Sequence, residues 1–113
     1  MDDAAIETVG NVSVLTLSAS FLDASNAPAL KQRVAALAER SPRLVLDLGQ
    51  VDFVDSSGCG AILTCLRQVN AMGGKLAVCG VSRPVHALFE LVRMNRILDV
   101  FDSREGAVKA VGS

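Results

Sequence analysis

Two adjacent serines beside carboxylates form the segment of this sequence best suited to chemistry. They lie in the run Val51-Asp52-Phe53-Val54-Asp55-Ser56-Ser57-Gly58-Cys59-Gly60, which crosses from an apolar stretch into a helical pattern. The start of a helix leaves backbone N–H groups unpaired and carries partial positive charge. A serine there can be an N-cap, and it can also be an exposed acceptor for a phosphoryl group. The spacing favours Ser56 or Ser57 as the N-cap and leaves the phosphoacceptor open as the alternative.

Other catalytic chemistries lack the residues that they need. A nucleotide cradle is disfavoured because the segment has no P-loop lysine and Gly58-Cys59-Gly60 does not extend into a dinucleotide-binding fingerprint. A serine-hydrolase elbow is disfavoured because Ser57 lacks glycines at the required spacing and no base is evident. The one histidine, His86, is expected on a helix face next to Pro84. The sequence therefore predicts no enzyme activity, no cofactor and no metal.

The nearby carboxylates and the three cysteines have simpler interpretations. Asp47 is expected inside a strand, and Asp52 and Asp55 on the loop that follows it. Solvation, capping and a partner contact are favoured for them over a metal site or an acid/base pair. The cysteines, which fit neither a disulfide framework nor a CxxC pair, are expected to be small reduced hydrophobes: Cys59, Cys65 and Cys79.

The elements that must position the serines alternate between strands and helices. Residues 6–9 and 12–17 predict a hairpin, and the apolar run 44–48 is typical of a parallel strand buried on both faces. Periodicity predicts a helix with Asp23 or Ser25 as its candidate N-cap that ends before Ser41, and a second helix that begins just after Gly58 and ends before Met72. It then predicts a strand at 75–79, a helix opened by Pro84 with an apolar face packed on the sheet, a strand at 100–101 and a helix at 107–111.

This alternation predicts one α/β domain over residues 1–113. Helical patterns between strands favour parallel pairing through right-handed crossovers after the initial hairpin. We therefore expect a small mixed, mostly parallel sheet, with an N-terminal hairpin followed by βα units and about four packed helices.

The composition excludes several classes of partner. The chain has 11 Lys and Arg against 12 Asp and Glu, a net charge of -1, and no Trp or Tyr. It therefore offers neither the basic groove nor the aromatic platform of a nucleic-acid binder. Charges or glycines interrupt every apolar run, so no membrane insertion is expected. The acidic start Met1-Asp2-Asp3 is unlike a secretory signal, which favours a cytoplasmic location.

The serine segment also carries a family resemblance. The stretches Leu46-Asp47-Leu48 and Val51 to Leu63 resemble the signature of the STAS domain, in particular its stand-alone members, the anti-sigma factor antagonists or anti-anti-sigma factors. The resemblance covers nearly the whole chain and includes the following pieces: Leu22-Asp23, Gly73-Gly74-Lys75-Leu76, Pro84-Val85 and Leu88-Phe89.

The resemblance implies the STAS fold and a regulatory role. Members of this group bind an anti-sigma factor serine kinase when unphosphorylated and so free a sigma factor for transcription. The kinase phosphorylates the serine after the motif's aspartate, here Ser56, and a PP2C-type phosphatase reverses the modification. The resemblance implies a partner-binding surface at Asp23, Asp55, Ser56, Ser57 and Gly58. Oligomeric state, sigma factor, kinase and phosphatase stay open.

Elementary electrostatics is compatible with such a switch. A phosphate on Ser56 adds roughly -1.5 to -2 charge next to Asp55 and close to Asp52. In an interface that charge repels an acidic partner and costs desolvation, while the helix N-terminus tolerates it in the free domain. An alternative function is a STAS subunit of an ABC-type lipid or solute transport system, which needs no phosphorylation. The intact Asp55-Ser56-Ser57-Gly58 favours the regulator.

Overall fold

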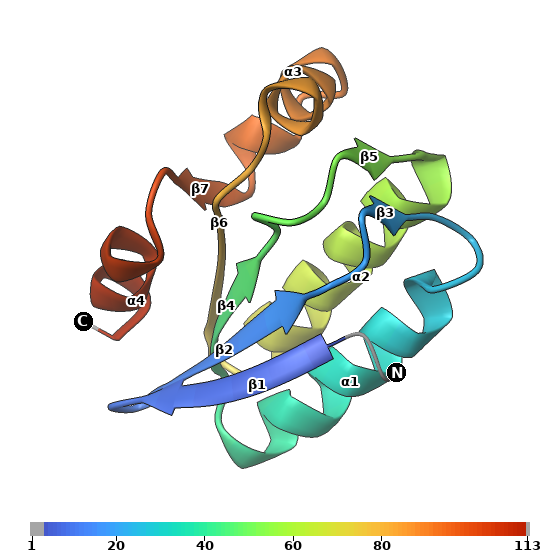
Figure 1. Ribbon diagram of the computed structural model, residues 1–113. Helices are drawn as coiled ribbons and strands as arrows, with labels where there is room; N and C mark the ends of the chain where they lie inside the picture. The colour runs from blue at the N-terminus through green and yellow to red at the C-terminus, as the bar shows by residue number, and fades with distance from the viewer. Residues whose placement is uncertain (1–3, 113) are drawn as a thin grey trace.

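In the computed structural model, which describes residues 4–112, five strands form the central sheet in the order β1-β2-β4-β6-β7 (Figure 1). Their bounds are β1 Ala4–Val9, β2 Val12–Leu17, β4 Arg43–Asp47, β6 Lys75–Cys79 and β7 Asp99–Phe101. The β1–β2 pair is an antiparallel hairpin that turns at Gly10, where φ is +60°, and the other pairs are parallel. The predicted α/β class, with a hairpin followed by βα units, is confirmed.

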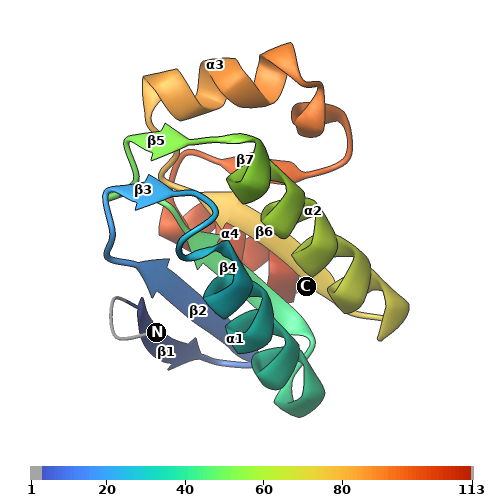
Figure 2. The same cartoon turned by 90° about the vertical axis from the view of Figure 1, so that its right-hand side faces the viewer.

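The four helices are divided between the faces and one end of the sheet. They are α1 Ala27–Arg40, α2 Ser56–Ala71, α3 Arg83–Leu91 and α4 Arg104–Gly112, with a short 3₁₀ helix, η1, at Met94–Arg96. Helices α1 and α2 cover one face of the sheet and α4 covers the other (Figure 2). Helix α3 lies across the end of the sheet where the parallel strands finish.

The strands are buried on both faces, so two hydrophobic cores form. Along β2, Leu15 and Leu17 belong to the core beneath α1 and α2, whereas Val12 and Val14 belong to the core beneath α4. Successive side chains of a strand point to opposite faces, which produces this division. The central strands β4 and β6 repeat it, which accounts for the nearly continuous apolar run in β4.

A second sheet, made of two parallel strands and called the small sheet below, was not predicted from the sequence. Strands β3 (Phe21–Leu22) and β5 (Phe53–Val54) pair residue for residue, Phe21 with Phe53 and Leu22 with Val54. The amide of Asp52 also donates to the carbonyl of Ser20 at 2.7 Å. Two-residue strands are too short to show any periodicity. The pair nevertheless fixes the segments that lead into α1 and α2.

The apolar face of α3 is only partly used for the core. Val85 and Phe89 are buried at 1% exposure each, but Val92, just after the helix, is 49% exposed. Core packing on the sheet was expected to account for this whole face, and that expectation is wrong at Val92. Because α3 lies across the end of the sheet, only one side of it reaches buried surface.

Candidate functional site

The cap of α2 is an aspartate, so the expected N-cap role of Ser56 or Ser57 is wrong. The Asp55 carboxylate accepts a hydrogen bond from the Gly58 amide at 2.9 Å, and the Asp55 carbonyl accepts the amide of Cys59 at 2.9 Å. Ser56 and Ser57 are the first two helical residues, and both are exposed. Within residues 4–112 neither hydroxyl has a hydrogen-bond partner. The helix therefore does not depend on either serine side chain.

Gly58 lets the start of α2 approach the small sheet. A Cβ at this buried position would lie 2.4 Å from the carbonyl oxygen of Leu22 and 2.7 Å from Cγ1 of Val54. Only glycine allows that separation without a backbone shift. Gly58 therefore lies beneath the surface that carries the serines and fixes the position of the helix from which they project.

The loop before α1 is held by its own polar side chains. The Asp23 carboxylate accepts hydrogen bonds from the Ser25 hydroxyl at 2.6 Å and the Ser25 amide at 2.9 Å. These bonds, the hydroxyl's first, lower the pKa of Asp23. Asn26, which is buried, accepts from the Asp23 amide through Oδ1 and donates to the Phe21 carbonyl through Nδ2.

The expected N-cap of α1 is also wrong. The N-cap position belongs to Asn26 and has no side-chain capping bond, because the amide group of Asn26 is engaged within the loop. The carbonyl of Asp23 accepts the amide of Ala27 at 2.8 Å instead. Asn26 is a structural residue of the site region that sequence reasoning missed. Its signal, an Asn directly before a helix that has proline in its first turn, was present in the sequence.

The small sheet brings two distant acidic residues to one end of the molecule. Asp23 and Asp55 directly follow the paired residues Leu22 and Val54, so the parallel pairing brings both aspartates to the same end of the two strands. The amide of Asp55 donates to the Leu22 carbonyl at 3.2 Å, which fixes this register. Asp23, Asp55 and Ser56 thus lie at the end where the parallel strands finish, the usual location for functional groups in such sheets.

Ser56 and Ser57 face two different hollows. Ser56 borders a groove of about 360 Å³ between the start of α2 and the helix α3. Ser57 borders a shallower hollow between α1 and α2, next to Lys31. Gly60 borders both. The first turn of α2 is therefore an exposed ridge between two concave surfaces.

Asp47 does not belong to this site. Its carboxylate accepts hydrogen bonds from Arg104 at 2.9 and 3.1 Å and from the Gly49 amide at 2.8 Å. Arg104 also donates to Thr16, and its pKa is raised chiefly by the hydrogen bond to Asp47. Sequence reasoning placed Asp47 correctly in a strand but missed Arg104, because 57 residues separate the two partners.

The cysteines are protonated thiols inside the protein. All three are free and buried, as the sequence predicts. Burial raises the pKa of Cys65 to about 12 and that of Cys79 to about 11, and burial together with the charge of Asp55 raises the pKa of Cys59. None therefore has the thiolate character that reactive cysteines need.

Residues 4–112 contain neither a metal-binding cluster nor a membrane-spanning helix. No group of three or more His, Cys, Asp or Glu side chains in that range could hold a metal ion. His86 forms an exposed contact with Glu90, 2.9 Å from Nδ1 to Oε1, and borders neither of the hollows beside the serines. No helix in the same range has both the length and the apolar character required to cross a membrane.

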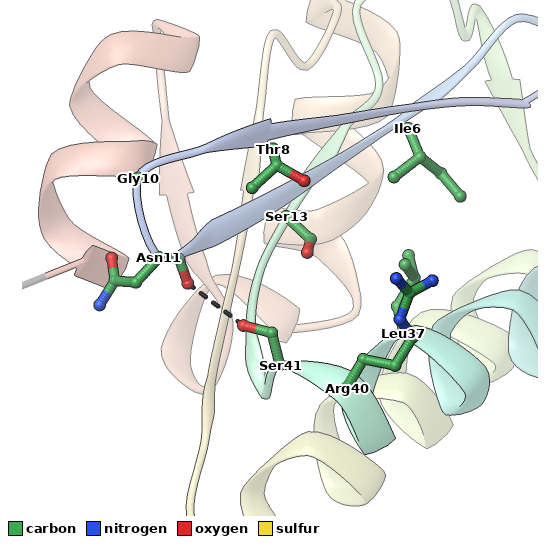
Figure 3. Close-up of a pocket in the computed structure, with 8 residues that line it drawn as sticks. All are labelled: Ile6, Thr8, Gly10, Asn11, Ser13, Leu37, Arg40 and Ser41. Carbon is green, nitrogen blue, oxygen red and sulfur yellow. Dashed lines mark hydrogen bonds between the residues drawn. The ribbon is translucent and has the colours of Figure 1, made fainter.

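A polar pocket lies at the opposite end of the sheet from the serines. It has a volume of about 280 Å³ and lies between the β1–β2 hairpin and the end of α1 (Figure 3). Thr8, Ser13 and Arg40 line it, and the Ser41 hydroxyl donates to the Asn11 carbonyl at its edge. No candidate residue predicted from the sequence borders this pocket.

Sequence comparisons connect the chain to a known family. The model of the STAS domain matches residues 3–107. The chain is 38% identical over 65 residues to the anti-sigma F factor antagonist of Paenibacillus polymyxa, a match covering 58% of this chain and 56% of that relative. It is 30% identical over 91 residues to the anti-sigma-B factor antagonist of Bacillus subtilis, which covers 80% of this chain and 84% of that relative.

Structure comparisons show the same fold. An anti-sigma-factor antagonist domain protein from Planctomyces limnophilus superposes with a TM-score of 0.87 at 18% identity, covering 98% of this chain and 99% of that one. The antagonist SpoIIAA in its unphosphorylated form gives a TM-score of 0.73 at 19% identity, covering 97% and 98%. Its phosphorylated form gives 0.72 at 19% identity, covering 96% and 98%.

Proposed function

The chain belongs to the STAS domain family, and we propose that it is an anti-sigma factor antagonist that phosphorylation of Ser56 switches off. Unphosphorylated, it binds an anti-sigma factor serine kinase and frees a sigma factor for transcription. The observation that carries this proposal is the exposed Ser56 hydroxyl, which is free of hydrogen bonds within residues 4–112 at the start of a helix capped by Asp55. The names of the relatives and the existence of a phosphorylated form of SpoIIAA support it.

The proposed partner-binding surface consists of Asp23, Asp55, Ser56, Ser57 and Gly58. The first four are at least partly exposed at one end of the molecule, whereas Gly58 acts from beneath by setting the position of α2. The Asp23 side chain is held by Ser25, so the loop presents a fixed carboxylate and binding orders little of it. Such a surface suits docking of another protein.

Phosphorylation of Ser56 changes this surface without disturbing the core. The phosphate brings roughly -1.5 to -2 charge to a position directly after Asp55. The unpaired amides of the first turn stabilise it in the free protein. A bound partner would exclude water from the phosphate, and the cost of that desolvation opposes the complex. The exposed phosphoserine would in turn be accessible to a PP2C-type phosphatase.

In this proposal the protein is a cytoplasmic regulator with no catalytic activity of its own. A Ser56 hydroxyl that acts as substrate for a kinase needs no base, metal or cofactor within this chain. The rival role, a subunit of an ABC-type transport system, needs a similar docking surface but no phosphoacceptor.

A pull-down from the native cytoplasm tests the proposal. We expect the unmodified protein and Asn70→Asp to retain a serine kinase, and Ser56→Asp to retain much less of it. Asn70→Asp is the matched control because it adds the same charge to an exposed residue at the other end of α2, outside the proposed partner-binding surface. Retention of an ABC ATPase equally by all three proteins would reverse the assignment.

The captured kinase then identifies the acceptor. With ATP we expect it to phosphorylate the unmodified protein and Ser57→Ala but not Ser56→Ala, measured by intact mass. Ser56→Ala should fold normally because no hydrogen bond within residues 4–112 uses that hydroxyl. Continued phosphorylation of Ser56→Ala would exclude Ser56 as the acceptor.

A further inference from the structure

The groove beside Ser56 is lined mainly by apolar side chains. We call it the α2–α3 groove and define it by the six apolar residues that line it: Val54, Cys59, Leu63, Leu88, Val92 and Met94. Ser56 and Asp55 border it at the start of α2. The Asp55 carboxylate is already engaged by the Gly58 amide. The groove therefore offers an apolar floor with the Ser56 hydroxyl at its rim.

The placement of α3 and a glycine keep this groove open. Helix α3 packs against the small sheet and η1 across the end of the molecule, so Leu88 is only partly buried and Val92 is 49% exposed. On the opposite wall, a Cβ at Gly60 would meet no atom within 4 Å. Exposed apolar surface of this kind beside a polar rim is characteristic of interaction sites.

We propose that the α2–α3 groove receives an aliphatic side chain of the anti-sigma factor kinase. The inference rests on the proposed function, because a kinase that transfers a phosphoryl group to Ser56 must cover the surface around that hydroxyl. Apart from Ser56, Asp55 and Gly60, every residue that lines the groove is apolar. Its occupant is therefore uncharged and apolar.

The position of Ser56 at the rim of the groove connects affinity for the kinase with control by phosphorylation. When the groove is filled, the partner covers the Ser56 hydroxyl at low cost, because a neutral hydroxyl is much cheaper to bury than an ion. A phosphate at that rim would have to lose its water when the partner side chain enters. Phosphorylation of Ser56 therefore opposes entry of the partner side chain into the groove. This effect adds to any repulsion between the phosphate and acidic groups of the partner.

Binding of the captured, purified kinase to two neighbouring variants tests the proposal. Val92→Glu places a charge on the wall of the groove, and Leu91→Glu places the same charge on a residue that is 80% exposed and does not line it. We expect Val92→Glu to weaken binding about ten- to one-hundredfold, the value of one buried aliphatic side chain, and Leu91→Glu to change it less than about threefold. Melting curves confirm that both variants are folded.

Methyl NMR of the unsubstituted protein gives a second readout. On addition of the kinase, the methyl signals of Leu88 and Val92 should shift or broaden, whereas that of Leu91 should change much less. If the unmodified protein and Ser56→Asp retain the kinase equally, the proposed function fails and the groove proposal falls with it. If only Ser56→Asp loses the kinase, while Val92→Glu binds like Leu91→Glu and the Leu88 and Val92 methyls stay unchanged, the groove proposal alone is overturned.

Discussion

Gly58 and Gly60 lie two residues apart in α2, but the first is tightly packed and the second faces open space. A Cβ at Gly58 would overlap the Leu22 carbonyl, at 2.4 Å, whereas a Cβ at Gly60 meets nothing within 4 Å. Both residues belong to α2, so an added methyl group tests chiefly the space around each position. The pair therefore tests how closely the serine segment packs on β3.

We predict opposite effects on stability from the two alanine substitutions. Gly60→Ala should raise the free energy of unfolding by about 0.5–1 kcal/mol, because alanine loses less backbone entropy in a helix. Gly58→Ala should lower it by about 1–3 kcal/mol, because the added methyl forces α2 away from β3. Urea denaturation measures both. Equal effects for the two variants would contradict the close approach at Gly58.

Among the elements, the long periodic helices and the buried strands were predictable from sequence. The repeat Leu30, Val34 and Leu37 specifies the core face of α1, and all three residues are buried. The two-residue strands β3 and β5 were not predictable, because two residues carry no period and their pairing joins segments about 30 residues apart.

In the candidate site, too, some features were predictable from the sequence and others were not. The run from Asp55 to Gly58 marks a helix start, so its location followed from sequence. The identity of the cap did not follow, because Asp and Ser both cap well and the choice depends on where β5 ends. The groove next to Ser56 was also unpredictable, because it depends on α3 lying across the end of the sheet.

Helix α4 is joined to the central sheet by long-range hydrogen bonds near both of its ends: Arg104 binds Asp47, and Arg43 donates to the Val111 carbonyl. It has nine residues, of which Ala107 and Val111 are buried, so local propensity and packing stabilise it weakly. Arg104, its first residue, joins it to Asp47 in β4 and to Thr16 in β2. The Asp47 side chain is only 15% exposed, which makes this ion pair stronger than one at the surface.

We expect Arg104→Met to release α4. The substitution leaves the Asp47 carboxylate without its cation and should lower the free energy of unfolding by about 1–3 kcal/mol. Amide hydrogen exchange should accelerate in α4 more than in α1. Glu7→Gln is the control, because the Glu7 side chain is 60% exposed and its bond to Arg104 is worth less than about 1 kcal/mol. Unchanged exchange in α4 would show that its buried side chains and the Arg43 bond to the Val111 carbonyl hold it without Arg104.

At the scale of the whole molecule, the charge change of the proposed switch occurs at the surface, at one end of the protein. The net charge is -1, so one phosphate on Ser56 would bring it to about -3 at one end of the protein. Within residues 4–112, the buried polar residues are Ser13 and Asn26, and no Asp, Glu, Lys or Arg is buried. The titratable groups of the two cores beneath α1, α2 and α4 are thiols, and two of them, Cys65 and Cys79, do not line the α2–α3 groove. Stability should therefore respond to alkaline pH through residues outside the proposed switch.

We predict that stability falls as the pH rises above about 9. In the unfolded chain the thiols lose their protons near pH 9.0, while the folded protein keeps Cys65 protonated up to a pKa of about 12 and Cys79 up to about 11. Between these values the unfolded state binds fewer protons, so deprotonation favours unfolding. The free energy of unfolding should drop on the order of 2 kcal/mol between pH 8 and pH 10. Urea denaturation under reducing conditions measures it.

The double variant Cys65→Ala/Cys79→Ala provides the control for this prediction. It should be less stable at pH 7, because each substitution removes a buried sulfur atom and leaves space in a core. Its stability should nevertheless change much less than that of the unsubstituted protein between pH 8 and pH 10, since the two thiols no longer titrate. If both proteins lose stability in parallel over this range, then groups other than Cys65 and Cys79 control the alkaline transition.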